Sequence, residues 1–237
     1  MNFIEATSFF LRVVTFDFIN KNNAINLKFR LIPMYHIGSK KYYEQVLKTI
    51  NECDELLFEG VKGKSYTRFY TNQYKSIADK LGITTQRDFF LQNKPDPSVK
   101  TIHADFSEQD SMQEWQKLTL KAKLNLSIIR PIRFYYWYQS GITREKFIHY
   151  NMTSQRELFL AYGPIDDKKG TAENFIMNAR EMIVKDIVQA KFENENQEDK
   201  LVGIMYGAAH MNTFARYLID MLGYRPYNGQ FLKVLNA

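Results

Sequence analysis

The chain contains the same type of segment near both of its ends. Each copy passes from a short apolar stretch through a turn with a histidine into a helix with one apolar face. The first copy, residues 29–46, reads FRLIPMYHIGSKKYYEQV, and the second, residues 201–224, reads LVGIMYGAAHMNTFARYLIDMLGY. Strands followed by such turns build parallel sheets, whose strands end at one crevice where α/β proteins bind ligands. The repeat therefore predicts that His36 and His210 meet at this crevice.

Strands alternate with helices at both ends of the chain, around a helical middle. The expected strands cover residues 13–19, 27–34 and 55–59, the start of 98–110, the stretch before His210, and residues 231–235. One helix is expected to begin after the N-cap Ser39, and a second covers 74–81 and ends at Gly82. Further helices are expected at 112–161, with breaks at Pro131 and Gly141, at 172–192, and from His210 to Met221. This order predicts an α/β fold, in which a mixed β-sheet core is flanked by helices.

The helical middle, at about residues 112–165, is expected to be an insertion that caps the crevice at the strand ends. No Gly/Ser-rich linker separates it from the rest, so residues 1–237 are predicted to form a single domain. With 45% hydrophobic residues, the chain can bury a substantial core.

Several features favour a cytoplasmic protein. The single cysteine, Cys53, excludes an internal disulfide and fits a reducing compartment. No stretch approaches the roughly 18 apolar residues that a membrane helix requires. Glu5 and Arg12 interrupt what would be the core of a signal peptide.

The net charge of +6 is mostly dispersed, except in residues 112–150. The basic residues of this region are Lys117, Lys121, Lys123, Arg130, Arg133, Arg144 and Lys146, against Glu114 and Glu145. It includes the sequence RPIRFYYWY at 130–138. One interpretation is an aromatic helix that packs in the core, with solvated lysines on its far side. The other is a docking surface for a membrane or a protein partner. No specific nucleic acid is expected as a partner.

The two turn histidines and Glu59 are candidate metal ligands. A histidine in a turn is usually structural, but matching turns and a strand that ends in Glu59 favour a shared site. If their strands are neighbours and parallel, His36 and Glu59 occupy adjacent positions at the sheet edge. Two histidines and one carboxylate suit zinc or a harder divalent ion, with a coordination position left for water. The alternative for Glu59 is a solvated strand end.

Arg180 stands out on the helix expected at 172–192. It falls within the apolar stripe of Ile176, Ala179, Ile183, Val184 and Ile187, away from the face expected to carry Glu173, Glu181 and Lys185. A buried guanidinium is costly unless a carboxylate or ligand pairs with it. The expected partner is Glu59, Asp105 or an anionic substrate. The alternative is a side chain that reaches solvent from the edge of the helix.

A third cluster lies in the sequence HADFSE at 103–108. Asp105, at a strand end, is expected to reach the same crevice, and His103 points the same way two residues earlier. Alternatively, Asp105 or Ser107 caps the next helix. HExxH, GxSxG, phosphate-binding-loop and dinucleotide-binding motifs are missing. Cys53 lies in an apolar helix end, which argues against a nucleophilic role.

The order of these motifs resembles that of the TraB/PrgY–Tiki–GumN superfamily, which is sometimes grouped with erythromycin esterase-like and ChaN-like proteins. The resemblance rests on HIG at 36–38, LLFE at 56–59, NAREM at 178–182 and YGAAH at 206–210, with ADFS at 104–107 as the acidic turn. It covers the sheet core and leaves the middle helices without a matching motif. One departure is Pro33, which stands where the first histidine motif usually has glycine; proline fixes φ and removes a donor.

The resemblance implies a metal-dependent hydrolase of the peptidase type (a metalloprotease). His36, Glu59 and His210 would hold a divalent ion (Mn, Co or Zn), and Glu59 and Arg180 would be catalytic. His103, Asp105 and Asn178 would support them. The implied substrate is a peptide or another small molecule with an amide bond. The alternative is a non-catalytic binding or regulatory protein of the same fold, which docks through residues 130–138.

Overall fold

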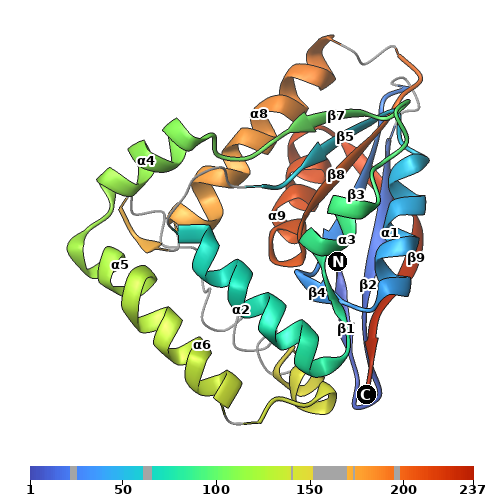
Figure 1. Cartoon of the computed structure of the whole chain (residues 1–237). Helices are drawn as coiled ribbons and strands as arrows, with labels where there is room; N and C mark the ends of the chain where they lie inside the picture. Colours follow the sequence, from blue (N-terminus) through green and yellow to red (C-terminus); the bar gives the residue numbers. More distant parts are fainter. Residues whose placement is uncertain (22–25, 61–65, 140, 152–169, 173, 195–197) are drawn as a thin grey trace.

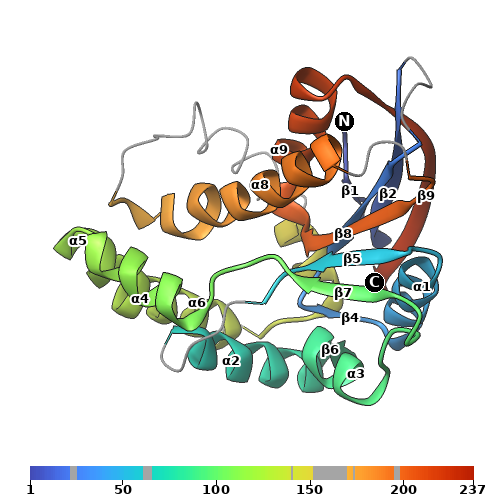
Figure 2. The same cartoon turned by 90° about the horizontal axis from the view of Figure 1, so that it is seen from above.

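The computed structural model describes the whole chain except residues 22–25, 61–65, 140, 152–169, 173 and 195–197. A mixed sheet crosses the molecule, with helices packed on both of its faces (Figures 1 and 2). The chain therefore has the α/β fold that its sequence predicts.

Parallel strands form one half of the sheet and antiparallel strands the other. The strand order is β1-β2-β3-β8-β5-β7, and β9 pairs with β2. The strands are β1 (Ile4–Ala6), β2 (Phe10–Asn20), β3 (Lys28–Met34), β5 (Glu55–Phe58), β7 (Lys100–His103), β8 (Leu201–Gly207) and β9 (Tyr224–Asn236). β3, β8, β5 and β7 are parallel, whereas β1, β2 and β9 pair antiparallel. The expected hairpin of β2 and β3 is present; β1 was not predicted, and β9 is longer than expected.

β8 lies between β3 and β5, so the expectation that His36 and Glu59 end neighbouring strands is wrong. The residues of β8 from Val202 to Tyr206 are all buried. A strand that is apolar along its whole length is stable only with both faces covered. β8 is the second-to-last strand in the sequence, but its apolar residues place it in the interior of the sheet.

Each face of the sheet has its own apolar core. On one face pack α1 (Lys40–Asn51), α2 (Tyr66–Leu81) and α3 (Gln86–Gln92), next to a short antiparallel sheet of two strands, β4 (Ile37–Gly38) and β6 (Thr84–Thr85). On the other face pack α8 (Ala179–Asn194) and α9 (Met211–Arg216), which continues into the π-helical turn η4 (Tyr217–Met221). Figure 2 shows the two helical layers on opposite sides of the sheet.

Local capping explains where several helices begin and end. Ser39 Oγ accepts a hydrogen bond from the backbone N–H of Tyr42 (3.2 Å), which caps α1 as predicted. Gly82, at φ 62°, ends α2 in the left-handed region that glycine tolerates. Ser107 caps α4 (Glu108–Lys117) together with Asp110 in a capping box. The cap of α4 is therefore Ser107, and Asp105 is left for another role.

The helical middle is continuous where a break was expected. α5 (Leu120–Leu124), the π-helical turn η1 (Asn125–Ile129) and α6 (Arg130–Gln139) follow one another without interruption, so the break at Pro131 is wrong. Pro131 is the second residue of α6, and in the turn before it the N–H of Arg130 bonds to the carbonyl of Asn125, five residues back. This wider turn accommodates a residue without an N–H. The expected break at Gly141 is present, at φ 76°.

The middle helices extend away from the sheet (Figure 1) and contact the rest of the molecule through apolar side chains and hydrogen bonds. Leu118, Ala122 and Leu126 pack with Phe106 and with Phe175 of the π-helical turn η2 (Asn174–Asn178), which leads into α8. At the end of the helical residues 144–151, Asn151 Oδ1 accepts a hydrogen bond from the hydroxyl of Tyr35 (3.0 Å), in the turn after β3. Residues 152–165 of the expected insertion lie outside the described residues. Among the helices described, none is long and apolar enough to cross a membrane.

Candidate functional site

Arg180 contacts two carboxylates at the C-terminal edge of the parallel strands. It lies in the first turn of α8, and its side chain is 11% exposed. Nε donates to Asp105 Oδ1 (2.8 Å), and Nη2 donates to Asp105 Oδ2 (2.6 Å) and to Glu59 Oε1 (2.6 Å). Burial opposes the charge of the guanidinium, but the bonds and charges of Asp105 and Glu59 raise the pKa of Arg180. Both expected partners are therefore present, and Asp105 makes the two-pronged contact.

Asp105 uses all of its hydrogen-bonding capacity inside the protein. Oδ1 accepts from Arg180 and from the N–H of Phe106 (2.8 Å), and Oδ2 accepts from Arg180 and from the N–H of Gly60 (2.9 Å). A carboxylate offers about four lone-pair sites, and the side chain of Asp105 is fully buried. Asp105 therefore positions Arg180 and the chain after β5, and it has no acceptor site left for a ligand.

Glu59 receives fewer hydrogen bonds than Asp105. Oε1 accepts from Arg180, and Oε2 accepts from the N–H of Gly207 (2.5 Å). Burial opposes ionisation, but the charges of Arg180, His36 and His210 and the hydrogen bond from Arg180 lower the pKa of the Glu59 carboxyl below its ordinary value. Glu59 is therefore an ionised carboxylate with about half of its acceptor sites still available.

Glu59 lines a cavity of about 350 Å³ that opens beside α2 and α3. The lining residues are His36, Phe58, Glu59, Gly60, Tyr74, Thr85, Gln86, Arg87, Phe90 and Met205. His36 is exposed; its Nδ1 lies 3.3 Å from Gln86 Oε1, and its ring lies 4.9 Å from the ring of Tyr74. The cavity therefore brings together two of the three expected metal ligands, His36 and Glu59.

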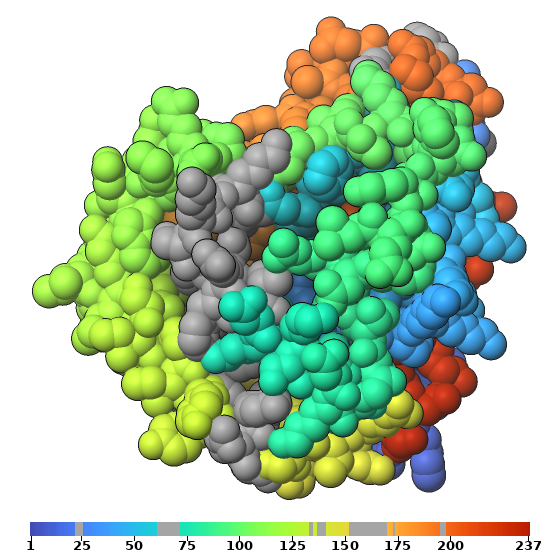
Figure 3. All heavy atoms as spheres, in the orientation of Figure 1, coloured from blue at the N-terminus to red at the C-terminus, as the bar shows by residue number. Residues whose placement is uncertain are grey.

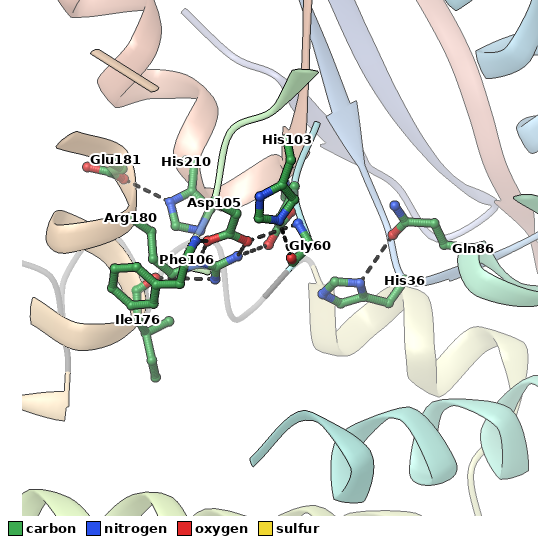
Figure 4. A network of polar contacts seen from close by, with 12 residues as sticks. His36, Gly60, Gln86, His103, Asp105, Phe106, Ile176, Arg180, Glu181 and His210 are labelled. Atoms are coloured by element: carbon green, nitrogen blue, oxygen red, sulfur yellow. Dashed lines mark hydrogen bonds and ion pairs between the residues drawn. The ribbon is translucent and has the colours of Figure 1, made fainter. Parts of the chain in front are cut away.

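His210 lies on the other side of Glu59. A Cβ placed on Gly207 would be 3.3 Å from Glu59 Oε2 and 3.5 Å from His210 Cδ2, so both side chains border the same point above Gly207. Residue 207 lies in register with Met34 on β3, so the two histidine turns leave the same edge of neighbouring strands. In Figure 4, His210 lies close to Arg180 and Asp105, whereas His36 lies apart and points toward Gln86.

Glu181 is a site residue that the sequence pattern did not identify. It was expected on the solvated face of α8, but it is 1% exposed, and its Oε1 lies 2.9 Å from Nδ1 of the buried His210. The buried residues of α8 are Glu181, Val184, Val188 and Lys191. This series has the three- and four-residue spacing of a helix face. Because it begins and ends with a charged residue, the sequence pattern did not identify it as a buried face. The expected solvated face was therefore wrong at Glu181.

Gly60, the residue after Glu59, forms hydrogen bonds with the side chains of both His103 and Asp105. The Nε2 of His103 lies 2.6 Å from the carbonyl oxygen of Gly60; because a carbonyl only accepts, Nε2 carries the proton. The N–H of Gly60 donates to Asp105. His103 and Asp105 therefore fix the backbone next to Glu59. The third supporting candidate, Asn178, is half-buried at the end of η2, two residues before Arg180.

Tyr206, the last residue before Gly207, is a second residue that was missed. It is fully buried, and its hydroxyl has no hydrogen-bond partner among the described residues. The guanidinium carbon of Arg180 lies 5.4 Å from the centre of its ring, and the ring of His210 packs edge-on at 5.0 Å. Burial raises the pKa of Tyr206; Arg180 opposes this rise, and the nearby carboxylates of Asp105 and Glu59 add to it.

The three expected ligands are not assembled around one point. Within the described residues, no three side chains of the histidine, cysteine, aspartate and glutamate types are grouped as metal ligands. His36 faces the cavity, Glu59 lies at its inner wall, and His210 lies beyond Gly207. The residues on the cavity itself, Glu59 and His36, are of the types that bind divalent ions.

The fold and the site together define an α/β protein with a charged cluster at the C-terminal ends of its parallel strands. Two carboxylates share one guanidinium, so Glu59, Asp105 and Arg180 carry a net negative charge. A comparison with protein-family models, curated proteins and solved structures found no match. The resemblance to the TraB/PrgY–Tiki–GumN superfamily therefore stays a prediction.

Proposed function

We propose that the cavity is the active site of a hydrolase that cleaves an amide bond in a peptide or a similar small molecule. The observation that carries the proposal is Glu59. It is ionised, it keeps unused acceptor sites, and it borders both a cavity of about 350 Å³ and His210. A carboxylate in this state can accept a proton from an attacking water molecule.

The other residues of the site take roles that follow from their contacts. His210 is oriented by Glu181, as a proton-transferring histidine is in many hydrolases. Arg180 donates four hydrogen bonds, to Asp105, Glu59 and the carbonyl of Ile176. A guanidinium has five N–H donors, so little remains for a substrate. We therefore assign Arg180 the role of positioning Glu59, in place of the catalytic role that the resemblance implies.

The proposal includes the divalent ion that the family resemblance implies. Glu59 and His36 would hold it, since both line the cavity and have suitable ligand atoms. A divalent ion bound there would lower the pKa of a coordinated water molecule.

The test combines metal analysis with a search for hydrolysis. The protein is purified without chelator, its Mn, Co and Zn contents are measured, and a mixture of peptides is incubated with it and analysed by mass spectrometry. We expect bound metal and peptide cleavage, both reduced in His36→Ala and Glu59→Gln. Glu44→Gln, at an exposed carboxylate of α1, is the matched control and should change neither.

The two parts of the proposal fail separately. If the metal-free protein cleaves peptides and Glu59→Gln abolishes this cleavage, the proposed metal is contradicted and the proposed hydrolase is supported. Cleavage that persists unchanged in folded Glu59→Gln would contradict the assignment of the active site. Folding of each variant is checked by circular dichroism.

A further inference from the structure

The continuous helix formed by α5, η1 and α6 carries a row of exposed apolar side chains. The row consists of Leu120, Leu124, Ile128, Ile132 and Tyr136, whose exposure ranges from 48% to 84%. Ile129 and Tyr135 lie beside it and are also exposed. Soluble proteins seldom leave so many large apolar side chains in one uninterrupted row.

The π-helical turn η1 keeps this row straight. The members of the row are four residues apart, and four residues exceed one turn of an α-helix, which holds about 3.6. A row with this spacing would therefore wind around a regular helix. A π-helical turn holds more residues, so η1, at Asn125–Ile129, turns the second half of the row back into line with the first. The distortion at the centre of the helix thus has a consequence for its surface.

The opposite side of the helix is fixed to the molecule. Ala122 and Leu126 are buried against Phe106 and Phe175, in the cluster that joins the middle helices to η2. The row must then face outward. Figures 1 and 3 show the segment along one outer edge of the molecule. The helix is therefore held with its apolar row presented to the surroundings.

The charged residues of the helix Leu120–Gln139 are all basic. No acidic residue occurs between Glu114 and Glu145. The basic residues in this interval are Lys117, Lys121, Lys123, Arg130, Arg133 and Arg144. Lys117 is paired with Glu114, whereas Lys121 is exposed beside the row. A partner that covers the helix must be apolar in its centre and anionic at its rim.

We propose that this helix, Leu120–Gln139, binds the surface of a membrane that contains anionic lipids. An apolar face with basic residues beside it and tyrosine at the interface is the arrangement by which helices lie in the headgroup region. Each lysine or arginine adds attraction to anionic headgroups. Nucleic acid matches the charge but offers no surface for a row of leucine and isoleucine. The segment RPIRFYYWY is then the second half of a longer docking helix.

Vesicle flotation of the full chain tests the proposal, with phosphatidylcholine vesicles compared with vesicles that also contain phosphatidylserine. We expect binding to the anionic vesicles that weakens at high salt. Ile128→Asp/Ile132→Asp should lower the vesicle partition coefficient more than about tenfold, because it places charge in the apolar row. Lys121→Glu/Lys123→Glu should also lower it about tenfold or more. Lys41→Glu/Lys48→Glu, at exposed lysines of α1, has the same change in net charge and should retain binding.

Three results would overturn the proposal. The first is no flotation of the intact protein with anionic vesicles at low salt. The second is equal binding of the intact protein and both helix variants. The third is self-association of the intact protein that Ile128→Asp/Ile132→Asp abolishes, without vesicle binding, because a second copy would then cover the row. Circular dichroism and thermal unfolding establish that the variants remain folded.

Discussion

Arg180 and Asp105 form two parallel hydrogen bonds across the C-terminal edge of the sheet, at 2.8 and 2.6 Å. The pair joins α8 to the turn after β7, and it closes one side of the cluster that holds Glu59. Both side chains are almost fully buried. The contact therefore links the stability of the fold to the geometry of the proposed active site.

Arg180→Ala should lower the free energy of unfolding by about 3–5 kcal/mol, because it leaves buried carboxylates without their cation. Arg180→Lys should recover part of this loss but not the two-pronged contact. Urea denaturation measures both. Lys28→Ala removes a pair with Asp199 at the surface and should cost less than about 1 kcal/mol. A loss below about 0.5 kcal/mol in Arg180→Ala, the size typical of exposed positions, would contradict the buried contact.

Tyr206→Phe should leave stability unchanged or raise it by about 1 kcal/mol, because it removes a buried hydroxyl that has no partner among the described residues. Tyr42 is the matched control: it is also fully buried, but its hydroxyl donates to the carbonyl of Pro33 (2.9 Å). Tyr42→Phe should cost about 1 kcal/mol. Thermal and urea unfolding compare the two variants. Equal losses in both would mean that the Tyr206 hydroxyl is bonded in solution.

Glu181→Ala should cost about 1–3 kcal/mol, since it leaves the buried ring of His210 without its partner. Because the two side chains are in contact, the effects of Glu181→Ala and His210→Ala should not add in the double variant. The control is Glu193→Ala, at an exposed position of the same helix, which should stay within about 0.5 kcal/mol. Additive effects of the first two substitutions would show that the contact is absent.

Glu59 should make the protein sensitive to acid. Its folded pKa lies below its ordinary value of 4.5, so its ionised form stabilises the fold above the unfolded pKa. This stabilisation is lost as the pH falls through the lowered folded pKa. Unfolding of the wild-type protein and Glu59→Gln, measured between neutral pH and pH values below 4.5, should show a stability difference that shrinks on acidification. A difference that is constant over this range would contradict the lowered pKa.

Local features of the structure were largely predictable. The N-caps at Ser39 and Ser107, the glycine at the end of α2 and the hairpin of β2 and β3 depend on residues near one another in the chain. The need of Arg180 for a carboxylate followed from its place among apolar residues. The continuous helix through Pro131 could not be predicted from local rules, because the π-helical turn that accommodates it is rare.

The sequence by itself determined the α/β class, most of the elements and the candidate residues His36, Glu59, Arg180 and His210, because periodicity and capping act over a few residues. Only the tertiary structure decided that β8 lies between β3 and β5, that Asp105 is the main partner of Arg180, and that Glu181 faces His210. These contacts join segments far apart in the chain. They depend on which apolar faces are buried together, and one strand's pattern does not specify its neighbours.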